Sequence, residues 1–199
     1  MATRFDANIV TAARRLHDRR TLAHSDTSEA SLRYSETLLV AYQNAAIRDV
    51  IRETYQKAGD AFGSIMPEMI KVSSATNVTN GVITNPADAW IIMEIAKSDY
   101  SWYATRITHN ILKVLAGRDA MLAPTVSKPA FYQTSTQTLI IPLSITGVQA
   151  VISYIPQPSD MVAGSGQTSD IPISPVWDGE IVDRMVAMGT ADAKSSLAL

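Results

Sequence analysis

The stretch of residues 129–158 constrains the fold most, because it cannot be helical. It is rich in β-branched and aromatic residues, has Pro129 and Pro158 at its ends, and is interrupted by Pro142 and Gly147. On both sides of Gly147 apolar residues alternate with the period of two that is typical of strands. The sequence therefore predicts a strand, a turn and a strand. The residues expected to face a core are Leu139, Ile141, Leu143, Val148, Ala150, Ile152 and Tyr154.

Helical periodicity appears on both sides of this stretch, most strongly over residues 35–58. Ser35 is placed to cap that helix, and Gly59 is placed to end it. The predicted apolar stripe consists of Leu38, Leu39, Tyr42, Ala45, Ala46, Val50, Ile51 and Tyr55. The opposite face is expected to be solvated and consists of Gln43, Asn44, Arg48, Arg52, Glu53 and Lys57.

Two further helices are predicted near the ends of the sequence. The first spans residues 6–19, with Asp6 as its cap. The last spans residues 175–193 and contains Gly189, which is unfavourable for its final turns. The expected inward residues are Ile9, Ala12, Ala13 and Leu16 in the first, and Trp177, Ile181, Val182, Met185 and Val186 in the last.

Between these helices the sequence predicts mainly strands. Asn80-Gly81 is a strong hairpin signal. The apolar run at residues 90–96 fits a buried strand, although its periodicity also fits a helix. A turn then leads to a strand over residues 102–107, and a short helix over 108–116 is expected to end at Gly117.

These elements divide the chain into four predicted parts: a helical part over residues 1–66, a β-rich insertion with one short helix over 67–158, a connector over 159–174, and a closing helix with a tail over 175–199. The predicted fold class is α+β. It is a helical bundle with an inserted antiparallel β subdomain, completed by a C-terminal helix and an extended tail.

Composition excludes several functional classes. The formal net charge of −2 gives no global reason to expect a nucleic-acid binder. The absence of cysteine excludes disulfides, thiolate metal sites and cysteine nucleophiles. No run approaches the ~20 apolar residues that span a bilayer, and the N-terminus lacks the apolar run of a signal peptide, so we expect a protein made in the cytoplasm. Charged residues make up only 18 %, which fits either a surface covered by other subunits or a charge-poor monomer.

No catalytic or metal motif is recognisable. His17, His24 and His109 lack a second ligand at metal-binding spacing, and the Gly-Ser-Gly at residues 164–166 is not followed by the Lys-Ser of a phosphate loop. We therefore expect neither an enzyme nor a cofactor. The remaining candidates are a basic cluster, for which a solvated helix end is the alternative, and Trp177, for which core packing is the alternative. The cluster consists of Arg14, Arg15, Arg19 and Arg20.

Five motifs follow one another in a specific order. Residues 32–45 (Leu-Arg-Tyr-Ser-Glu-Thr-Leu-Leu-Val-Ala-Tyr-Gln-Asn-Ala) open the long helix, and residues 85–90 (Asn-Pro-Ala-Asp-Ala-Trp) lead into a strand. Residues 128–132 and 151–158 begin and end the later strands, and residues 175–182 (Pro-Val-Trp-Asp-Gly-Glu-Ile-Val) open the last helix. In this order they resemble the head-to-tail adaptor, or connector, proteins of tailed bacteriophages.

The resemblance implies a structural protein of the virion neck, made in the host cytoplasm. Its family forms a closed homo-oligomeric ring of about twelve copies beneath the portal protein. The ring extends the DNA channel, touches the packaged DNA without sequence preference, and joins the head to the tail or to the next neck protein. The four arginines would contact DNA or an acidic partner. The implied partner-interface residues are Trp177, Ser195, Ser196, Leu197, Ala198 and Leu199.

Three other functions remain open. The long connector and the weakly charged long helix depart from the family, which leaves another ring-forming neck or tail-completion protein possible. A surface-displayed binding module would be favoured by outward-facing Phe131 and Tyr132. An enzyme of another type would need a concave pocket with convergent titratable groups.

Overall fold

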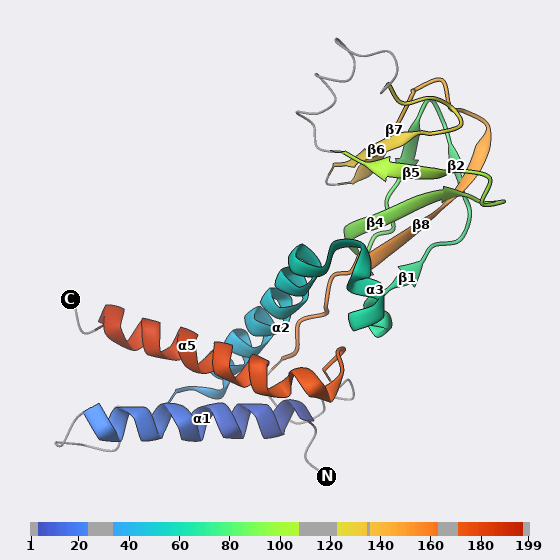
Figure 1. Ribbon diagram of the computed structural model, residues 1–199. Coiled ribbons are helices and arrows are strands. Elements are labelled where there is room, and N and C mark those ends of the chain that lie inside the picture. Colours follow the sequence, from blue (N-terminus) through green and yellow to red (C-terminus); the bar gives the residue numbers. More distant parts are fainter. Residues whose placement is uncertain (1–3, 24–33, 108–122, 135, 163–170, 197–199) are drawn as a thin grey trace. The chain divides into compact units, whose positions relative to one another are not determined.

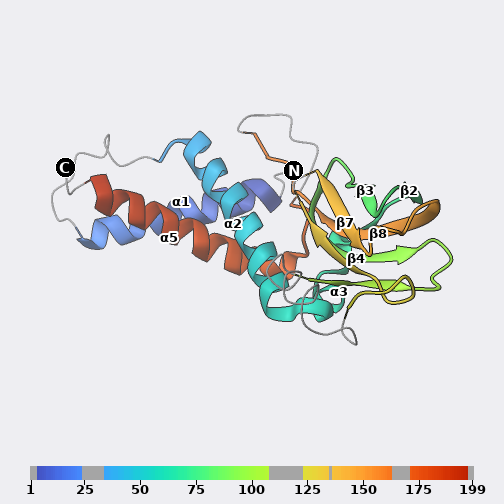
Figure 2. The ribbon, with the colours of Figure 1, turned by 90° about the horizontal axis from the view of Figure 1, so that it is seen from above.

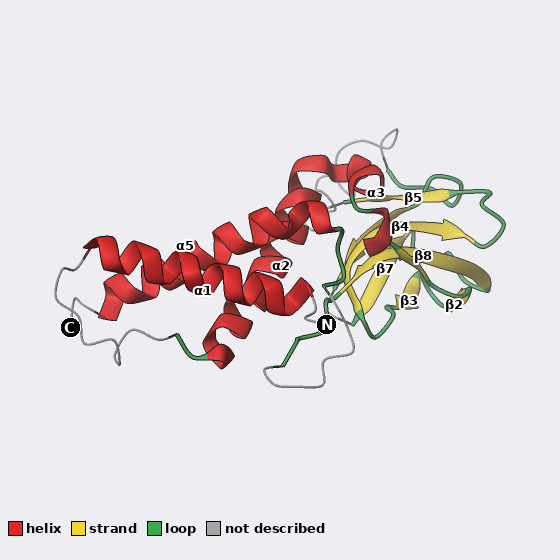
Figure 3. Ribbon diagram, turned by 90° about the horizontal axis from the view of Figure 1, so that it is seen from below, coloured by secondary structure: helices red, strands yellow, loops and turns green. Residues whose placement is uncertain are grey.

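The structure is a computed structural model that describes residues 4–23, 34–107, 123–134, 136–162 and 171–196 (Figure 1). The chain forms two compact units. The first contains residues 1–68 and 158–199, and the second contains residues 69–157. Among the described residues the helices lie in the first unit and the strands in the second (Figure 3).

Three helices make up most of the first unit: α1 (Arg4–Ala23), α2 (Glu36–Ala58) and α5 (Asp178–Ser196). The shorter turns are η2 (Gly59–Ala61), α3 (Phe62–Ile65), η3 (Pro67–Met69) and η4 (Pro175–Trp177). Helices α1 and α5 run side by side in the same direction (Figures 1 and 2), because Arg4 is bonded to Asp178 where both helices begin. Helix α2 is antiparallel to α5. Glu53, near the end of α2, accepts a hydrogen bond from Arg184 near the start of α5, and Tyr42, near the start of α2, donates one to Asp192 near the end of α5.

Local signals explain where α2 begins and ends. The Ser35 hydroxyl accepts a hydrogen bond from the backbone N–H of Leu38 at 3.2 Å, as an N-cap should. Gly59 ends the helix with a positive φ of 52° and donates its N–H to the carbonyl of Tyr55. Both predicted ends of this helix are confirmed.

The second unit is an eight-stranded sheet. Its strands are β1 (Lys71–Val72), β2 (Thr76–Val78), β3 (Val82–Thr84), β4 (Ala89–Lys97), β5 (Tyr103–Arg106), β6 (Ala130–Gln133), β7 (Gln137–Ile141) and β8 (Val148–Pro156). They follow the order β1-β8-β4-β5-β6-β7-β3, and β2 also pairs with β8. The sheet is mixed, because β5 and β6 are parallel while the other pairs are antiparallel.

A tight turn at Asn80 and Gly81 joins β2 to β3, with φ values of 50° and 71°, as the sequence predicts. One isolated bridge, between Thr79 and Val82, closes this turn, and the two strands otherwise pair with different neighbours, since β2 pairs with β8 and β3 pairs with β7. The turn therefore links the β8 side of the sheet to its β7 side, which curls the sheet. The curled sheet encloses a core of its own, which consists of Val78, Ile83, Ile92, Ile95, Trp102, Ala104, Phe131, Ile140, Ile145, Ala150, Ile152 and Tyr154.

The predicted fold class is wrong. The strands do not form a small antiparallel subdomain inserted in a helical bundle. They form a mixed sheet of eight strands with its own core. In the sequence, the long helices α1 and α2 precede these strands and α5 follows them. The pattern of single segments could not show this, because β8 pairs with β1, β2 and β4, which lie far from it along the chain.

The hairpin predicted over residues 129–158 is also wrong. Three strands occupy this stretch, and β7 and β8, on either side of the turn at residues 142–147, pair with different neighbours. The residues of β7 that face the core are also one position away from the predicted ones. Thr138 and Ile140 are buried, whereas Leu143, which was predicted to face the core, is 55 % exposed. In β8 the predicted face is confirmed at Ala150, Ile152 and Tyr154.

Smaller corrections concern the helical unit. Asp6 lies inside the first turn of α1 and is not its cap, because the helix already begins at Arg4. Trp177 belongs to η4, so α5 begins only at Asp178. Gln43 was expected on a solvated face but is fully buried. The helix predicted over residues 108–116 lies outside the described residues.

Candidate functional site

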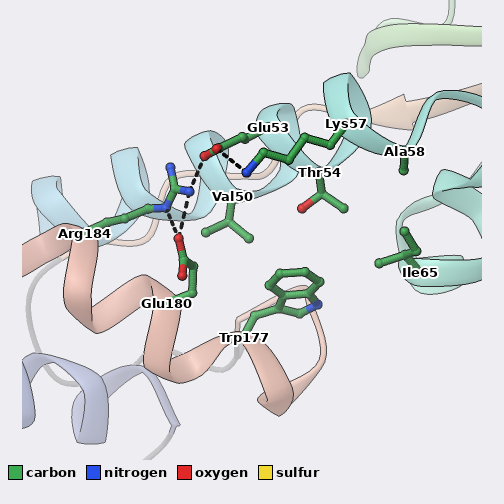
Figure 4. A pocket seen from close by; sticks show the side chains of 9 residues that line it. All are labelled: Val50, Glu53, Thr54, Lys57, Ala58, Ile65, Trp177, Glu180 and Arg184. Carbon is green, nitrogen blue, oxygen red and sulfur yellow. Dashed lines mark hydrogen bonds and ion pairs between the residues drawn. The ribbon is translucent and has the colours of Figure 1, made fainter.

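A cavity of about 360 Å³ lies between α2 and α5 in the helical unit, next to Trp177. The indole ring stands opposite Val50 and Thr54 of α2 (Figure 4). Charged side chains lie to one side of it, and Ala58 and Ile65 lie to the other. The cavity therefore combines an apolar wall with a charged rim. Its complete lining is Val50, Glu53, Thr54, Lys57, Ala58, Ile65, Trp177, Glu180 and Arg184.

The charged rim is a connected network. The guanidinium of Arg184 bonds the carboxylates of Glu53 and Glu180, the latter at 2.8 Å, and the ammonium of Lys57 lies 2.6 Å from Glu53 (Figure 4). Hydrogen bonds from Lys57 and then Arg184 lower the pKa of Glu53 from 4.5 to about 2. Two carboxylates and two cations thus balance one another at the mouth of the cavity.

Trp177 is the predicted site residue that the structure places in this cavity. It is half-buried, and its indole nitrogen is covered but has no hydrogen-bond partner among the described residues. A covered indole N–H normally finds an acceptor. The neighbouring Val176 is 79 % exposed. The segment that leads into α5 therefore contains a buried donor without an acceptor among the described residues, and an exposed apolar side chain.

Two tyrosines fix α2 to the end of α5. The hydroxyl of Tyr34 donates to the carbonyl oxygen of Gly189 at 2.9 Å, and the hydroxyl of Tyr42 donates to the carboxylate of Asp192. Burial and then the bond to Asp192 raise the pKa of Tyr42 above its usual range. Gly189 also faces α1, since a Cβ there would lie 2.9 Å from the end of the Leu16 side chain. The glycine that is unfavourable for the last turns of α5 therefore lies at the contact between α5 and α1.

Part of the predicted connector is held against α2. The side-chain amide of Asn44 makes two hydrogen bonds with the backbone of Met161, at 2.9 and 3.1 Å, and Arg48 forms an ion pair with Asp160. Met161 is buried in consequence. The sequence pattern predicts solvated positions for Asn44 and Arg48, because partners more than 100 residues away leave no local signal.

The basic cluster of α1 is only partly described. Arg14 is exposed, and Arg15 is bonded to Asp183 of α5 at 2.6 Å with half of its side chain in solvent. Arg19 and Arg20 belong to the helix, but their side chains lie outside the described residues. Of the two arginines whose side chains are described, Arg14 lies in solvent and Arg15 binds an aspartate of α5, so these two do not share a site.

The predicted tail is helical where it is described. Ser195 and Ser196 belong to the last turn of α5, while Leu197, Ala198 and Leu199 lie outside the described residues. The predicted partner-interface residues are thus divided between the cavity, which contains Trp177, and the far end of α5.

In the sheet unit, Asp88 joins the ends of two strands. Its carboxylate accepts hydrogen bonds from Lys71 at 2.8 Å and from the hydroxyl of Tyr154 at 2.9 Å. These bonds, led by that of Lys71, hold the pKa of Asp88 below its usual range. The three side chains come from β1, β8 and the turn before β4, so this cluster braces the sheet.

Sequence reasoning missed an exposed aromatic pair at the turn between β4 and β5, with Tyr100 in the turn and Tyr103 as the first residue of β5. Tyr100 is 58 % exposed and Tyr103 is 51 % exposed, and their ring centroids lie 6.2 Å apart. The outward aromatics expected on the later strands are absent, because Phe131 is fully buried and Tyr132 is half-buried. A non-glycine residue with positive φ, here Tyr100 at 57°, cannot be recognised from sequence.

The described residues contain no group of three or more His, Cys, Asp or Glu side chains arranged to hold a metal ion. None of their helices has the length and apolar character to cross a bilayer. No protein-family model matches this sequence, and no curated protein matches it.

Proposed function

We propose that this chain is a structural protein of a tailed-phage neck, an adaptor that forms a homo-oligomeric ring under the portal protein. The ring extends the channel through which DNA passes and joins the head to the tail or to a further neck protein. Its place is the virion, and its contact with packaged DNA is non-specific. No step of catalysis belongs to this role.

The observation that carries this proposal is the structural use of the motif residues behind the resemblance. Tyr34 and Tyr42 fasten α2 to α5, Asn44 holds the segment at Met161, and Asp88 braces the sheet. None of these polar groups lines the cavity beside Trp177. A sequence pattern that serves the framework is what a structural component needs, whereas an enzyme needs polar groups that converge on a substrate.

The cavity beside Trp177 favours docking over catalysis. Its titratable groups neutralise one another in ion pairs, so that Glu53 stays ionised down to a pH of about 2. A general acid or base would need a pKa near the working pH. An apolar wall with a balanced polar rim is instead the usual anatomy of a contact between proteins.

A surface-displayed binding module is supported less well. That function predicted outward-facing Phe131 and Tyr132, yet Phe131 has no exposed surface and contributes to the core of the sheet. The same layout in another ring-forming neck or tail-completion protein would use identical contacts, and the position of the ring in a particle distinguishes the two.

Electron microscopy of the purified chain, alone and with its portal protein, tests the proposal. We expect closed rings with a symmetry of about twelve, bound to the portal when both are present. Deleting residues 195–199 should weaken portal binding without lowering the melting temperature, because a terminal segment adds little to a core. Monomers in both samples would contradict the adaptor function.

A further inference from the structure

Two exposed tyrosines lie at the turn between β4 and β5, Tyr100 within the turn and Tyr103 at the start of β5, and hydrogen bonds hold this turn in place. The Asp99 carboxylate accepts a hydrogen bond from the backbone N–H of Ser101 at 2.9 Å and pairs with Lys97 at 2.8 Å. The backbone N–H of Tyr100 donates to the carbonyl of Lys97 at 2.8 Å, and Trp102 is buried behind the turn. These bonds fix the backbone from which both rings project.

Tyr100 keeps an unfavourable backbone conformation in this turn. Its φ of 57° lies in the left-handed region, which suits glycine or asparagine and which a tyrosine adopts at a cost. The cost brings no burial in return, because more than half of the ring is in solvent. Backbone strain of this kind is most often found at functional positions, so we expect the side chain of Tyr100 to bind a partner outside the sheet.

The cavity beside Trp177 has the chemistry that would receive a tyrosine. Its volume of about 360 Å³ corresponds to on the order of ten water molecules, which is ample for an aromatic side chain. Trp177 and Ile65 offer apolar contact, and Arg184 can stack on a ring.

Neither surface carries a net charge that would oppose this match. The turn carries one cation and one anion that pair with each other, Lys97 and Asp99, and the cavity rim carries two of each. A neutral aromatic turn is poorly suited to nucleic acid, which requires a positively charged surface. Tyrosine, tryptophan and arginine are also the residues that most often contribute most of the binding energy at protein–protein interfaces.

We infer that the Tyr100 and Tyr103 turn of one copy inserts into the Trp177 cavity of the next copy. This inference rests on the proposed ring, and it specifies which surfaces meet. The turn and the cavity are different surfaces of one chain, so the contact is head-to-tail, and a head-to-tail contact is the kind that generates rings. Each copy then gives one turn and receives one.

Cysteine cross-linking tests this contact directly, because the chain has no cysteine of its own. Ser101→Cys places a thiol beside the exposed tyrosines, and Ala58→Cys places one in the cavity wall; both changes are small. Under mild oxidation of the purified full chain, the double variant should form covalent ladders of many copies. An equal mixture of the two single variants should stop at the dimer, since each chain then has only one competent side.

Matched controls separate the contact from chance collision. Ala7→Cys, on an exposed position of α1, replaces Ala58→Cys and should reduce ladder formation at least tenfold. In the double-cysteine chain, Tyr100→Asn with Tyr103→Ser should slow cross-linking at least tenfold, whereas Leu143→Ser, which also removes an exposed apolar side chain from the sheet unit, should not. Because asparagine tolerates the left-handed conformation, Tyr100→Asn offsets part of the loss from serine in β5, and the variant should melt within a few degrees of its parent.

The outcomes distinguish this contact from the ring itself. Rings seen by electron microscopy without ladders would overturn the contact and leave the adaptor function standing. Ladders that persist after both tyrosines are replaced would overturn the role of the turn. A chain that is monomeric with and without its portal protein and forms no ladder would overturn both.

Discussion

Two glycines in the sheet unit form a matched pair for measuring the cost of a close backbone approach. Gly81 has a φ of 71° and Gly147 a φ of 70°, so alanine at either position adopts the same unfavourable conformation. A Cβ at Gly147 meets nothing within 4 Å. A Cβ at Gly81 collides with the carbonyl oxygen of Ile140 and lies 2.9 Å from Cα of Leu143.

The magnitudes follow from these surroundings. The left-handed conformation costs alanine about 1–2 kcal/mol, and the lower entropy of the unfolded chain returns about 0.4–1 kcal/mol. Gly147→Ala should therefore lower the free energy of unfolding by about 1 kcal/mol. In Gly81→Ala the collision also displaces two hydrogen bonds, Gly81 N–H to Ile145 at 2.7 Å and Ile140 N–H to Gly81 at 2.6 Å. At about 1 kcal/mol for each lost bond, the total cost should reach about 3–4 kcal/mol.

Urea unfolding, followed by far-ultraviolet circular dichroism and by tryptophan fluorescence, measures both variants. We expect the midpoint for Gly81→Ala to fall well below that for Gly147→Ala, with unchanged slopes. Equal losses, within about 0.5 kcal/mol, would refute the reasoning, because they would mean that the backbone around Ile140 yields without cost.

The remaining predictions concern the helices. Asp178→Ala should lower the free energy of unfolding by about 2–3 kcal/mol, because Asp178 accepts three hydrogen bonds from Arg4 and Asn8. Asp183→Ala should lower it by less than about 1 kcal/mol, since the ion pair of Asp183 with α1 is exposed. Equal losses of the two variants in chemical denaturation would contradict this. Gly189→Leu should lower the melting temperature by several degrees, whereas Gly189→Ala should stay near the parent, because only the mobile end of a leucine crowds its Cβ. Since the folded pKa of Glu53 is lowered from 4.5 to about 2, its stabilisation is complete above pH 4.5 and is lost as the pH falls to 2. The melting temperature should therefore change less with pH between 4.5 and 2 in Glu53→Gln than in the parent. The same pH dependence in both chains would contradict the role of Glu53.

Local signals in the sequence predict the parts of this fold that are themselves local. The Ser35 cap, the Gly59 end and the Asn80-Gly81 turn depend on neighbours within four residues, and all three are confirmed. The sheet as a whole depends on β8, whose partners are up to 83 positions away, as Lys71 and Tyr154 show. No periodicity records such pairings.

A buried polar residue explains why the core-facing side of β7 differs from the predicted one. Thr138 occupies a core position because its hydroxyl donates to the side chain of Asn85 at 2.7 Å, which satisfies the group without water. A pattern that counts only apolar residues assigns the opposite face. Gln43 is a harder case, since both of its amide atoms are buried without a partner among the described residues, and nothing in the structure explains it.

The candidate site divides in the same way. Trp177 could be selected from sequence as an aromatic residue beside a loose segment, and Glu53 with Lys57 is a recognisable pair one turn apart. Arg184, which completes the rim of the cavity, lies 131 positions from Glu53. The exposure of Tyr100 depends on a backbone angle that no composition reveals.

The pairing of β1 with β8 makes the sheet unit separable. The unit begins at residue 69 and ends at residue 157, and its first and last strands are neighbours, with Lys71 opposite Tyr154 and Val72 opposite Ser153. Its two ends are therefore already held together, so joining the helical segments by a short linker in place of the sheet would add little loop-closure entropy. A chain built in this way can exchange, enlarge or lose one module while the other keeps its own core.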